Sequence, residues 1–90
     1  MKAIYKYPLK ISDIQTIEMP YNSKILTVQM QNGAPCMWVL VEDNQTNLID
    51  RREILVIGTG HEFVSVGDYI GTFQVDTCVF HVFEEDKSNA

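Results

Sequence analysis

Apolar and polar residues alternate along most of the chain, and this period of two constrains the fold more than any other feature. Between Lys24 and Gln31, for example, Leu26, Val28 and Met30 share one face while threonine and glutamine side chains share the other. This is the pattern of a half-buried β-strand. No stretch of about ten residues carries the apolar stripe of an amphipathic helix. The chain is therefore expected to be all-β.

Turn-forming residues separate the alternating segments at intervals of roughly ten residues, which is typical of a small barrel or sandwich. The run 32–35, Asn-Gly-Ala-Pro, predicts a hairpin turn, because Asn-Gly favours positive φ and proline cannot donate within a ladder. Gly71 inside a strand indicates a bulge or a close backbone approach. We expect about seven short strands, mostly antiparallel because the connections are too short for parallel crossovers. They are Lys2–Leu9, Ile14–Met19, Lys24–Gln31, Cys36–Glu42, Leu48–Ile57, Tyr69–Val75 and Cys78–Glu84, with a polar break at 43–47 and a short piece at Glu62–Val66.

The 90 residues are enough for one domain, predicted over 1–84, followed by an acidic and disordered tail at 85–90. A domain this small buries only about 60–65% of the surface of its unfolded chain, so an extra source of stability is expected. Cys36 and Cys78 lie in apolar runs and are predicted to be buried, reduced thiols. Homo-oligomerisation is then the most plausible extra source.

The charge balance excludes some partners. Twelve acidic residues against seven Lys and Arg argue against general nucleic-acid binding, which needs a basic field. The N-terminus interleaves charges with apolar residues, unlike a signal peptide. No apolar run approaches the roughly 20 residues of a membrane span. A cytoplasmic protein without membrane contact is expected.

The segment Cys36–Glu42 is apolar on both faces, which predicts a strand covered on both sides, in a core or at a subunit interface. Trp38 is either a core residue or an interface anchor. The residues predicted for an interface are Trp38, Met37 and Val39.

The most suggestive local element is Gly58–Thr59–Gly60–His61, since a glycine-rich loop after a strand can cradle an anion on backbone N–H groups. No helix follows it and a third glycine is missing, so a plain tight turn is the competing interpretation. Adjacent arginines in a strand point to opposite faces, so one of them could line the same pocket, or both could pair with acids across strands. A tyrosine could stack on a base. The candidate ligand-binding residues are Gly58, Thr59, Gly60, His61, Arg51, Arg52 and Tyr69.

No catalytic signature is present. His61 beside Glu62 invites an acid–base role, yet no serine, threonine or cysteine stands in a recognisable nucleophile context. His81 lies in mid-strand and is expected to be a hydrogen-bonded strand residue. The two cysteines and two histidines have no ligand spacing. We therefore expect a non-enzymatic protein without catalytic residues, metal or cofactor.

Several stretches of the sequence are distinctive when taken together, among them KAIYKYPL (2–9), GTGH (58–61), GDYIGTF (67–73) and FHVF (80–83). Together they resemble a family of small uncharacterised proteins of bacteriophages and prophages. The resemblance covers nearly the whole chain. It implies a viral origin, expression in the bacterial host cytoplasm, an accessory role and a complete protein.

Two functions remain open from the sequence. The first is an interaction protein that binds a host factor, with antagonism of a host defence protein as one form. The second is a small-ligand binder that sequesters a phosphorylated, for example cyclic, nucleotide. A minor structural role in the virion is a further alternative.

Overall fold

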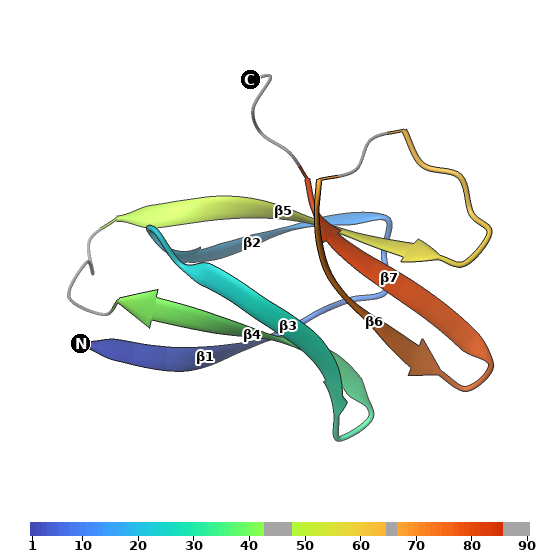
Figure 1. Cartoon of the computed structure of the whole chain (residues 1–90), viewed down its shortest axis with the longest axis horizontal. Helices are drawn as coiled ribbons and strands as arrows, with labels where there is room; N and C mark the ends of the chain where they lie inside the picture. The colour runs from blue at the N-terminus through green and yellow to red at the C-terminus, as the bar shows by residue number, and fades with distance from the viewer. Residues whose placement is uncertain (43–47, 65–66, 86–90) are drawn as a thin grey trace.

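In the computed structural model the chain is built from seven strands and two sheets (Figure 1). The structure describes residues 1–42, 48–64 and 67–85, and these contain no helix. The all-β prediction is thus confirmed. The strands are β1 (Lys2–Pro8), β2 (Ile14–Pro20), β3 (Lys24–Gln31), β4 (Ala34–Glu42), β5 (Ile49–Gly58), β6 (Asp68–Val75) and β7 (Cys78–Glu84).

The three-stranded sheet has the order β1-β4-β3, and the four-stranded sheet has the order β2-β5-β7-β6. Every neighbouring pair is antiparallel. One apolar core draws residues from both sheets, which makes the arrangement sandwich-like. The described strands form two sheets and not one closed barrel, so the sandwich alternative is the correct one. The buried core consists of Leu9, Met19, Val28, Met37, Val39, Val41, Ile54, Val56, Phe73 and Val82.

Strand β4 shows how the period of two builds the core. Met37, Val39 and Val41 point inward and are fully buried. Trp38 and Leu40 point outward and are only partly buried. The outer face of this strand is therefore not part of the core of the described chain, and its coverage at a subunit interface stays a prediction.

The β3–β4 hairpin has a two-residue turn, with positive φ at Asn32 (52°) and Gly33 (81°). The predicted turn 32–35 is too long, since Pro35 already lies in β4, opposite Met30. The residues flanking a two-residue turn form a hydrogen-bonded pair, so the next pair is not hydrogen-bonded. The missing N–H of Pro35 is therefore not needed by β3.

The structure confirms both features expected at Gly71, a bulge and a close approach of the backbone. The β6–β7 register shifts between Tyr69 and Gly71, which marks a bulge. A Cβ at position 71 would lie only 2.8 Å from Val28 Cγ1 on β3. Glycine thus lets β6 approach β3, where the edges of the two sheets meet.

The two cysteines differ in burial, and both are free thiols. Cys36 is buried as predicted. Cys78 is exposed, contrary to the prediction, because it is the first residue of β7 after the tight turn at 76–77. An apolar run therefore does not guarantee burial at a hairpin end.

Backbone pairing continues past the predicted domain end, since Glu85 N–H donates to Glu53 O at 2.9 Å. The rest of the predicted tail (86–90) and the polar break at 43–47 lie outside the described residues. Of the expected short strand at 62–66, positions 62–64 are described and are not a strand. Over the described ranges there is no helix long and apolar enough to cross a membrane.

Candidate functional site

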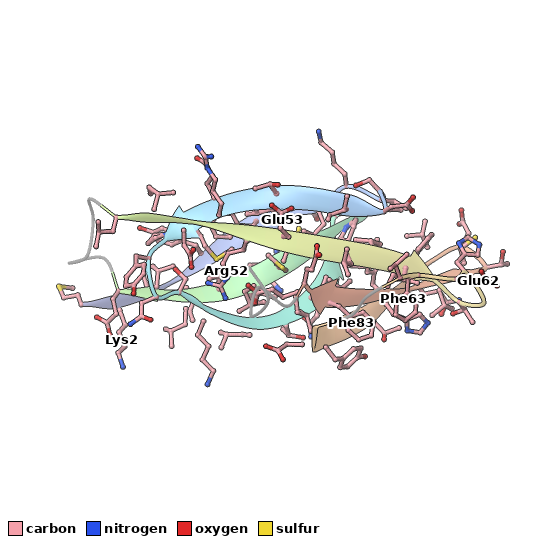
Figure 2. The ribbon with its side chains drawn as sticks, turned by 90° about the horizontal axis from the view of Figure 1, so that it is seen from above. Lys2, Arg52, Glu53, Glu62, Phe63 and Phe83 are labelled. Atoms are coloured by element: carbon pink, nitrogen blue, oxygen red, sulfur yellow. The ribbon has the colours of Figure 1, made fainter. Side chains whose placement is uncertain are left out.

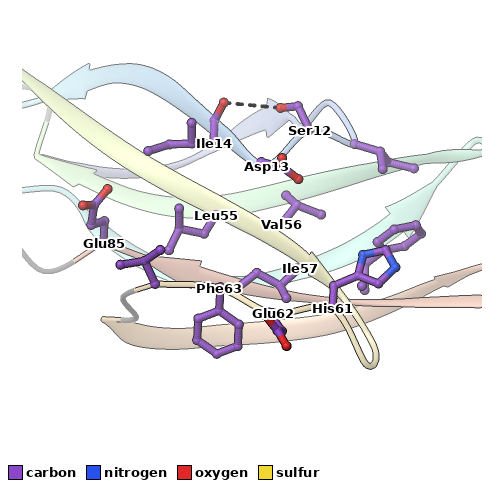
Figure 3. A pocket seen from close by; sticks show the side chains of 14 residues that line it. Ser12, Asp13, Ile14, Leu55, Val56, Ile57, His61, Glu62, Phe63 and Glu85 are labelled. Atoms are coloured by element: carbon purple, nitrogen blue, oxygen red, sulfur yellow. Dashed lines mark hydrogen bonds between the residues drawn. The ribbon is translucent and has the colours of Figure 1, made fainter.

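A pocket of about 590 Å³ lies at the end of β5. Figure 3 shows Ser12, Asp13 and Ile14 on one side of this strand and Glu62 and Phe63 on the other. Its walls thus come from the β1–β2 connection, β5, the loop after β5, and β7. The described lining residues are Ile11, Ser12, Asp13, Ile14, Leu55, Val56, Ile57, Gly58, His61, Glu62, Phe63, Val64, Phe80 and Glu85.

The pocket exists because β5 is longer than its partner β2. The first residue of β2, Ile14, pairs with Leu55. One more contact follows, from Val56 N–H to Asp13 O at 3.4 Å. Ile57 and Gly58 extend beyond this register and form the floor of the pocket.

The Gly58–His61 segment is a tight turn that also borders this pocket. His61 N–H donates to Gly58 O at 3.0 Å, and Gly60 adopts a positive φ of 86°. A Cβ at position 58 would lie 3.1 Å from His61 Nδ1, so glycine lets the imidazole lie against the strand. The tight-turn interpretation is therefore confirmed. The segment borders the pocket through Gly58 and His61, whereas Thr59 and Gly60 do not line it.

The pocket combines apolar walls with negative charge. Half or more of the surface of Ile11, Ile14, Phe63 and Val64 is exposed around it. We call these four side chains the pocket face. Three carboxylates also line the pocket, and no described lining residue is lysine or arginine. A phosphate group would therefore meet no cationic side chain except a protonated histidine. The three carboxylates belong to Asp13, Glu62 and Glu85.

Arg52 does not serve this pocket. Its guanidinium forms a bidentate pair with Glu84 and also donates to Ser23 O at 3.0 Å and Asp50 at 3.4 Å. The side chain is only 14% exposed. The hydrogen bond to Glu84 raises the pKa of Arg52, with partial burial opposing it. Figure 2 shows Arg52 far along the molecule from Glu62 and Phe63. Arg52 is the fourth of the ten residues of β5, and its ion pair with Glu84 is mostly buried.

Arg51 points to the opposite face, as predicted for adjacent strand residues, and its Nε lies 3.0 Å from Glu18 Oε2. It borders a second hollow with Glu18, Ile49 and Asp50. The arginines and the Gly58–His61 turn therefore sit at different ends of β5. The anion site that the sequence suggested is not assembled.

A chain of hydrogen bonds crosses the outer face of the four-stranded sheet. Tyr69 Oη lies 2.5 Å from Thr72 Oγ1, which lies 3.2 Å from His81 Nδ1. His81 Nε2 lies 2.7 Å from Thr59 Oγ1, which donates to Val79 O at 3.2 Å. His81 is thus a hydrogen-bonded strand residue, as predicted.

One assignment of hydrogens satisfies all four contacts. Thr59 O–H donates to the carbonyl, so His81 Nε2–H must donate to Thr59. His81 Nδ1 then accepts from Thr72 O–H, and Thr72 accepts from Tyr69 O–H. The sequence did not place Thr72 among the candidate binding residues, because its link to His81 depends on the cross-strand register of β6 and β7.

Three aromatic rings lie beside this chain of hydrogen bonds. Phe63 stacks on Phe83 with centroids 6.2 Å apart, and Tyr69 meets Phe83 edge-on at 5.5 Å. Figure 2 shows Phe63 and Phe83 at the same part of the molecule as Glu62. We call these three residues the aromatic cluster. It joins the pocket through Phe63, and of its members the sequence singled out only Tyr69.

The three predicted interface residues differ in burial. Met37 and Val39 are fully buried in the core of the single chain. Because they lie on the inner face of β4, a partner cannot reach them. Only Trp38, which is partly buried on the outer face, retains surface for an interface.

Within the described ranges no group of three or more His, Cys, Asp or Glu side chains is arranged to hold a metal ion. No curated protein and no solved structure matches the chain. One family model matches over residues 1–90, and its description is a domain of unknown function, DUF7352. That description names neither an activity nor a source, so the viral origin stays a prediction. The chain belongs to the DUF7352 family.

Proposed function

We propose that this chain is a non-enzymatic binding protein that contacts a protein partner through the pocket face. The observation that carries this proposal is the gathering of four exposed, large apolar side chains around one pocket. Single exposed apolar residues are normal on a soluble protein, but a contiguous group beside a concavity is typical of an interaction site.

Burial of the pocket face would supply useful binding energy. Each large apolar side chain that leaves water contributes about 1.5–3 kcal/mol, before the costs of association are subtracted. Phe63 is partly held by its stacking on Phe83, which lowers the entropy lost when a partner covers it. Because Ile11, Ile14 and Phe63 are already about half-buried, covering them contributes less than the full value for each side chain.

The resemblance to phage proteins supports a more specific form of this proposal. The chain would act in the bacterial host cytoplasm as an accessory protein, and its partner would be a host factor such as a defence protein. Self-association is a second form, in which Trp38 on the outer face of β4 contributes to a homo-oligomer. A phosphorylated nucleotide receives less support, because the described pocket wall carries carboxylates and no lysine or arginine.

The test compares two exposed residues on different surfaces. Phe63→Ser removes the central side chain of the pocket face, whereas Ile4→Ser changes a comparably exposed side chain on β1 (50% and 56% exposed). Tagged wild-type protein and both variants are used to capture partners from host lysate, and light scattering gives the oligomeric state. A partner, or a second copy, that Phe63→Ser loses and Ile4→Ser keeps would support the proposal. Equal capture by all three proteins, or no partner together with a strict monomer, would sink it.

A further inference from the structure

We propose that the pocket and the aromatic cluster receive a cationic side chain, lysine or arginine, from a basic segment of the partner. This inference rests on the proposed function and specifies the chemistry of the partner. Three features of the site carry it: exposed ring faces, carboxylates with no lysine or arginine among the described lining residues, and hydroxyl oxygens that can accept hydrogen bonds.

The aromatic cluster offers ring surface to a cation. Phe63 is 50% and Tyr69 60% exposed, so neither ring is consumed by the core. The angle of 63° between Tyr69 and Phe83 turns the two rings towards different directions of approach. A cation within about 6 Å of a ring centroid is attracted by the negative face of the ring. Two or three rings around one position add such contacts.

The charges beside the rings favour the same ligand. Glu62 and Glu85 line the pocket together with Phe63, and Asp13 faces them across β5 (Figure 3). Of the two arginines, Arg52 is engaged with Glu84 and Arg51 lies beside Glu18, and both lie in the first half of β5, outside the pocket lining. The field of the three pocket carboxylates would attract a cation and repel a phosphate or a carboxylate.

The chain of hydrogen bonds next to the aromatic cluster also favours a cationic ligand. In one assignment that satisfies every contact, the hydrogens of Tyr69, Thr72, His81 and Thr59 are all used within this network. What remains are lone pairs on the hydroxyl oxygens, Tyr69 Oη among them. These atoms can accept from a ligand but cannot donate. An ammonium or guanidinium group, which only donates, is complementary to them.

The size of the site fits one long side chain and its neighbours. A volume of about 590 Å³ lies within the usual range of small-ligand pockets, roughly 300–1,000 Å³. The aliphatic stem of lysine or arginine would pack on Ile14 and Leu55 while its charged head reaches the carboxylates. Such division between stem and head is the usual behaviour of these side chains.

The experiment titrates the full chain, labelled with ¹⁵N, with four blocked tripeptides. They share the frame acetyl-Leu-X-Leu-amide, where X is lysine, arginine, norleucine or glutamate. Norleucine keeps the apolar stem and removes the charge. We expect the lysine and arginine peptides to bind about three- to tenfold more tightly than the norleucine peptide, and the glutamate peptide to bind most weakly. The advantage of the charged peptides should shrink at 0.5 M NaCl because salt screens exposed charges.

Variants separate charge from apolar contact. Glu62→Gln and Glu85→Gln should each weaken the lysine peptide about two- to threefold and leave the norleucine peptide unchanged. Glu18→Gln is the matched control, since this carboxylate lies at the far end of β5 beside Arg51. Phe63→Ala should weaken every peptide. Equal affinity of the lysine and norleucine peptides, or an equal loss with Glu18→Gln, would overturn the inference.

Failure of the inference and failure of the proposed function give different results. If the peptides show no preference for charge while a captured partner still depends on Phe63, the cationic ligand is wrong and the binding function stands. If no peptide shifts resonances of the pocket residues at 10 mM and no partner depends on Phe63, both are wrong.

Discussion

The two ends of β5 are built from the same strand but handle charge in opposite ways. At one end the guanidinium of Arg52 meets Glu84, Asp50 and a backbone carbonyl, and it is mostly buried. At the other end Gly58 floors a pocket whose carboxylates have no described lysine or arginine in the lining. The first end is closed by its own charges, and the second is open.

The difference separates a structural charge from a candidate binding charge. A partly buried ion pair that loses one partner leaves a charge in a low-dielectric site, so it must be kept for stability. A solvated carboxylate beside exposed apolar rings stabilises little in the folded chain. The electrostatic attraction of such a carboxylate contributes only when a partner binds. The following predictions test this division.

The largest effect is expected at the closed end. Arg52→Ala should lower the free energy of unfolding by about 2–3 kcal/mol, because Glu84 is then left mostly buried without its partner. Chemical denaturation followed by Trp38 fluorescence measures the change. The double variant Arg52→Leu/Glu84→Leu should recover most of the loss. If the double variant is as unstable as Arg52→Ala, the loss of stability comes from the packing of the aliphatic stem of Arg52 and not from an unpaired charge on Glu84.

A smaller effect is expected from Gly58→Ala at the open end. The new Cβ would lie 3.1 Å from His61 Nδ1, but this imidazole is exposed and can move away. We expect a change of less than about 1 kcal/mol in unfolding free energy, together with displaced ring resonances of His61. Gly71→Ala is the contrasting variant, since its Cβ would meet the buried Val28 at 2.8 Å and should cost about 1–3 kcal/mol. Similar costs at the two glycines would contradict the idea that the pocket end is loosely packed.

Removing charge at the open end should leave stability almost untouched. Glu62→Gln and Glu85→Gln are each expected to change the free energy of unfolding by no more than about 0.5 kcal/mol. The measurement is the same denaturation experiment at low and high salt. A loss comparable with that of Arg52→Ala would mean that these carboxylates belong to the structure and not to a binding site.

The smallest effect concerns pH. The pKa of Arg52 is raised, mainly by its hydrogen bond to Glu84. A group whose pKa is higher in the folded chain contributes stability below its unfolded pKa and loses it as pH rises through the folded pKa. Because arginine stays protonated far above neutral pH even in the unfolded chain, nothing should be lost at moderately alkaline pH. The difference in unfolding free energy between wild type and Arg52→Leu should therefore stay constant within about 0.5 kcal/mol from pH 7 to 10. A steep change in this window would contradict the assignment.

Much of the fold could be predicted because strand pairing leaves a local mark. The alternation at Lys24–Gln31 and the Asn32-Gly33 turn fix a strand and a hairpin within a few residues. Where sequence reasoning failed, the decisive contact was distant. Pro35 was excluded from a strand because its pairing side was unknown, and Cys78 was expected to be buried because its neighbours are apolar.

The candidate site was only partly visible in the sequence. Gly58–His61 was identified, since glycines mark an unusual backbone. The pocket around it also needs Ile14 from β2 and Phe63 from the following loop, and neither residue carries a local signal. The arginines were assigned to the site by proximity in sequence, although a strand of ten residues places its two ends far apart.

By itself, the sequence determined the seven strands and most of their turns, because side-chain period and turn chemistry are local properties of the chain. Only the tertiary structure decided that β5 extends beyond the end of its pairing with β2 and so leaves room for the pocket. It also decided that Tyr69, Phe83 and Phe63 meet beside that pocket. These features depend on register and sheet order, which join residues far apart in the chain. For that reason the sequence does not show that the part of β5 around Arg52 is closed by an ion pair while the part at Gly58 borders an open pocket. Only the fold separates the two.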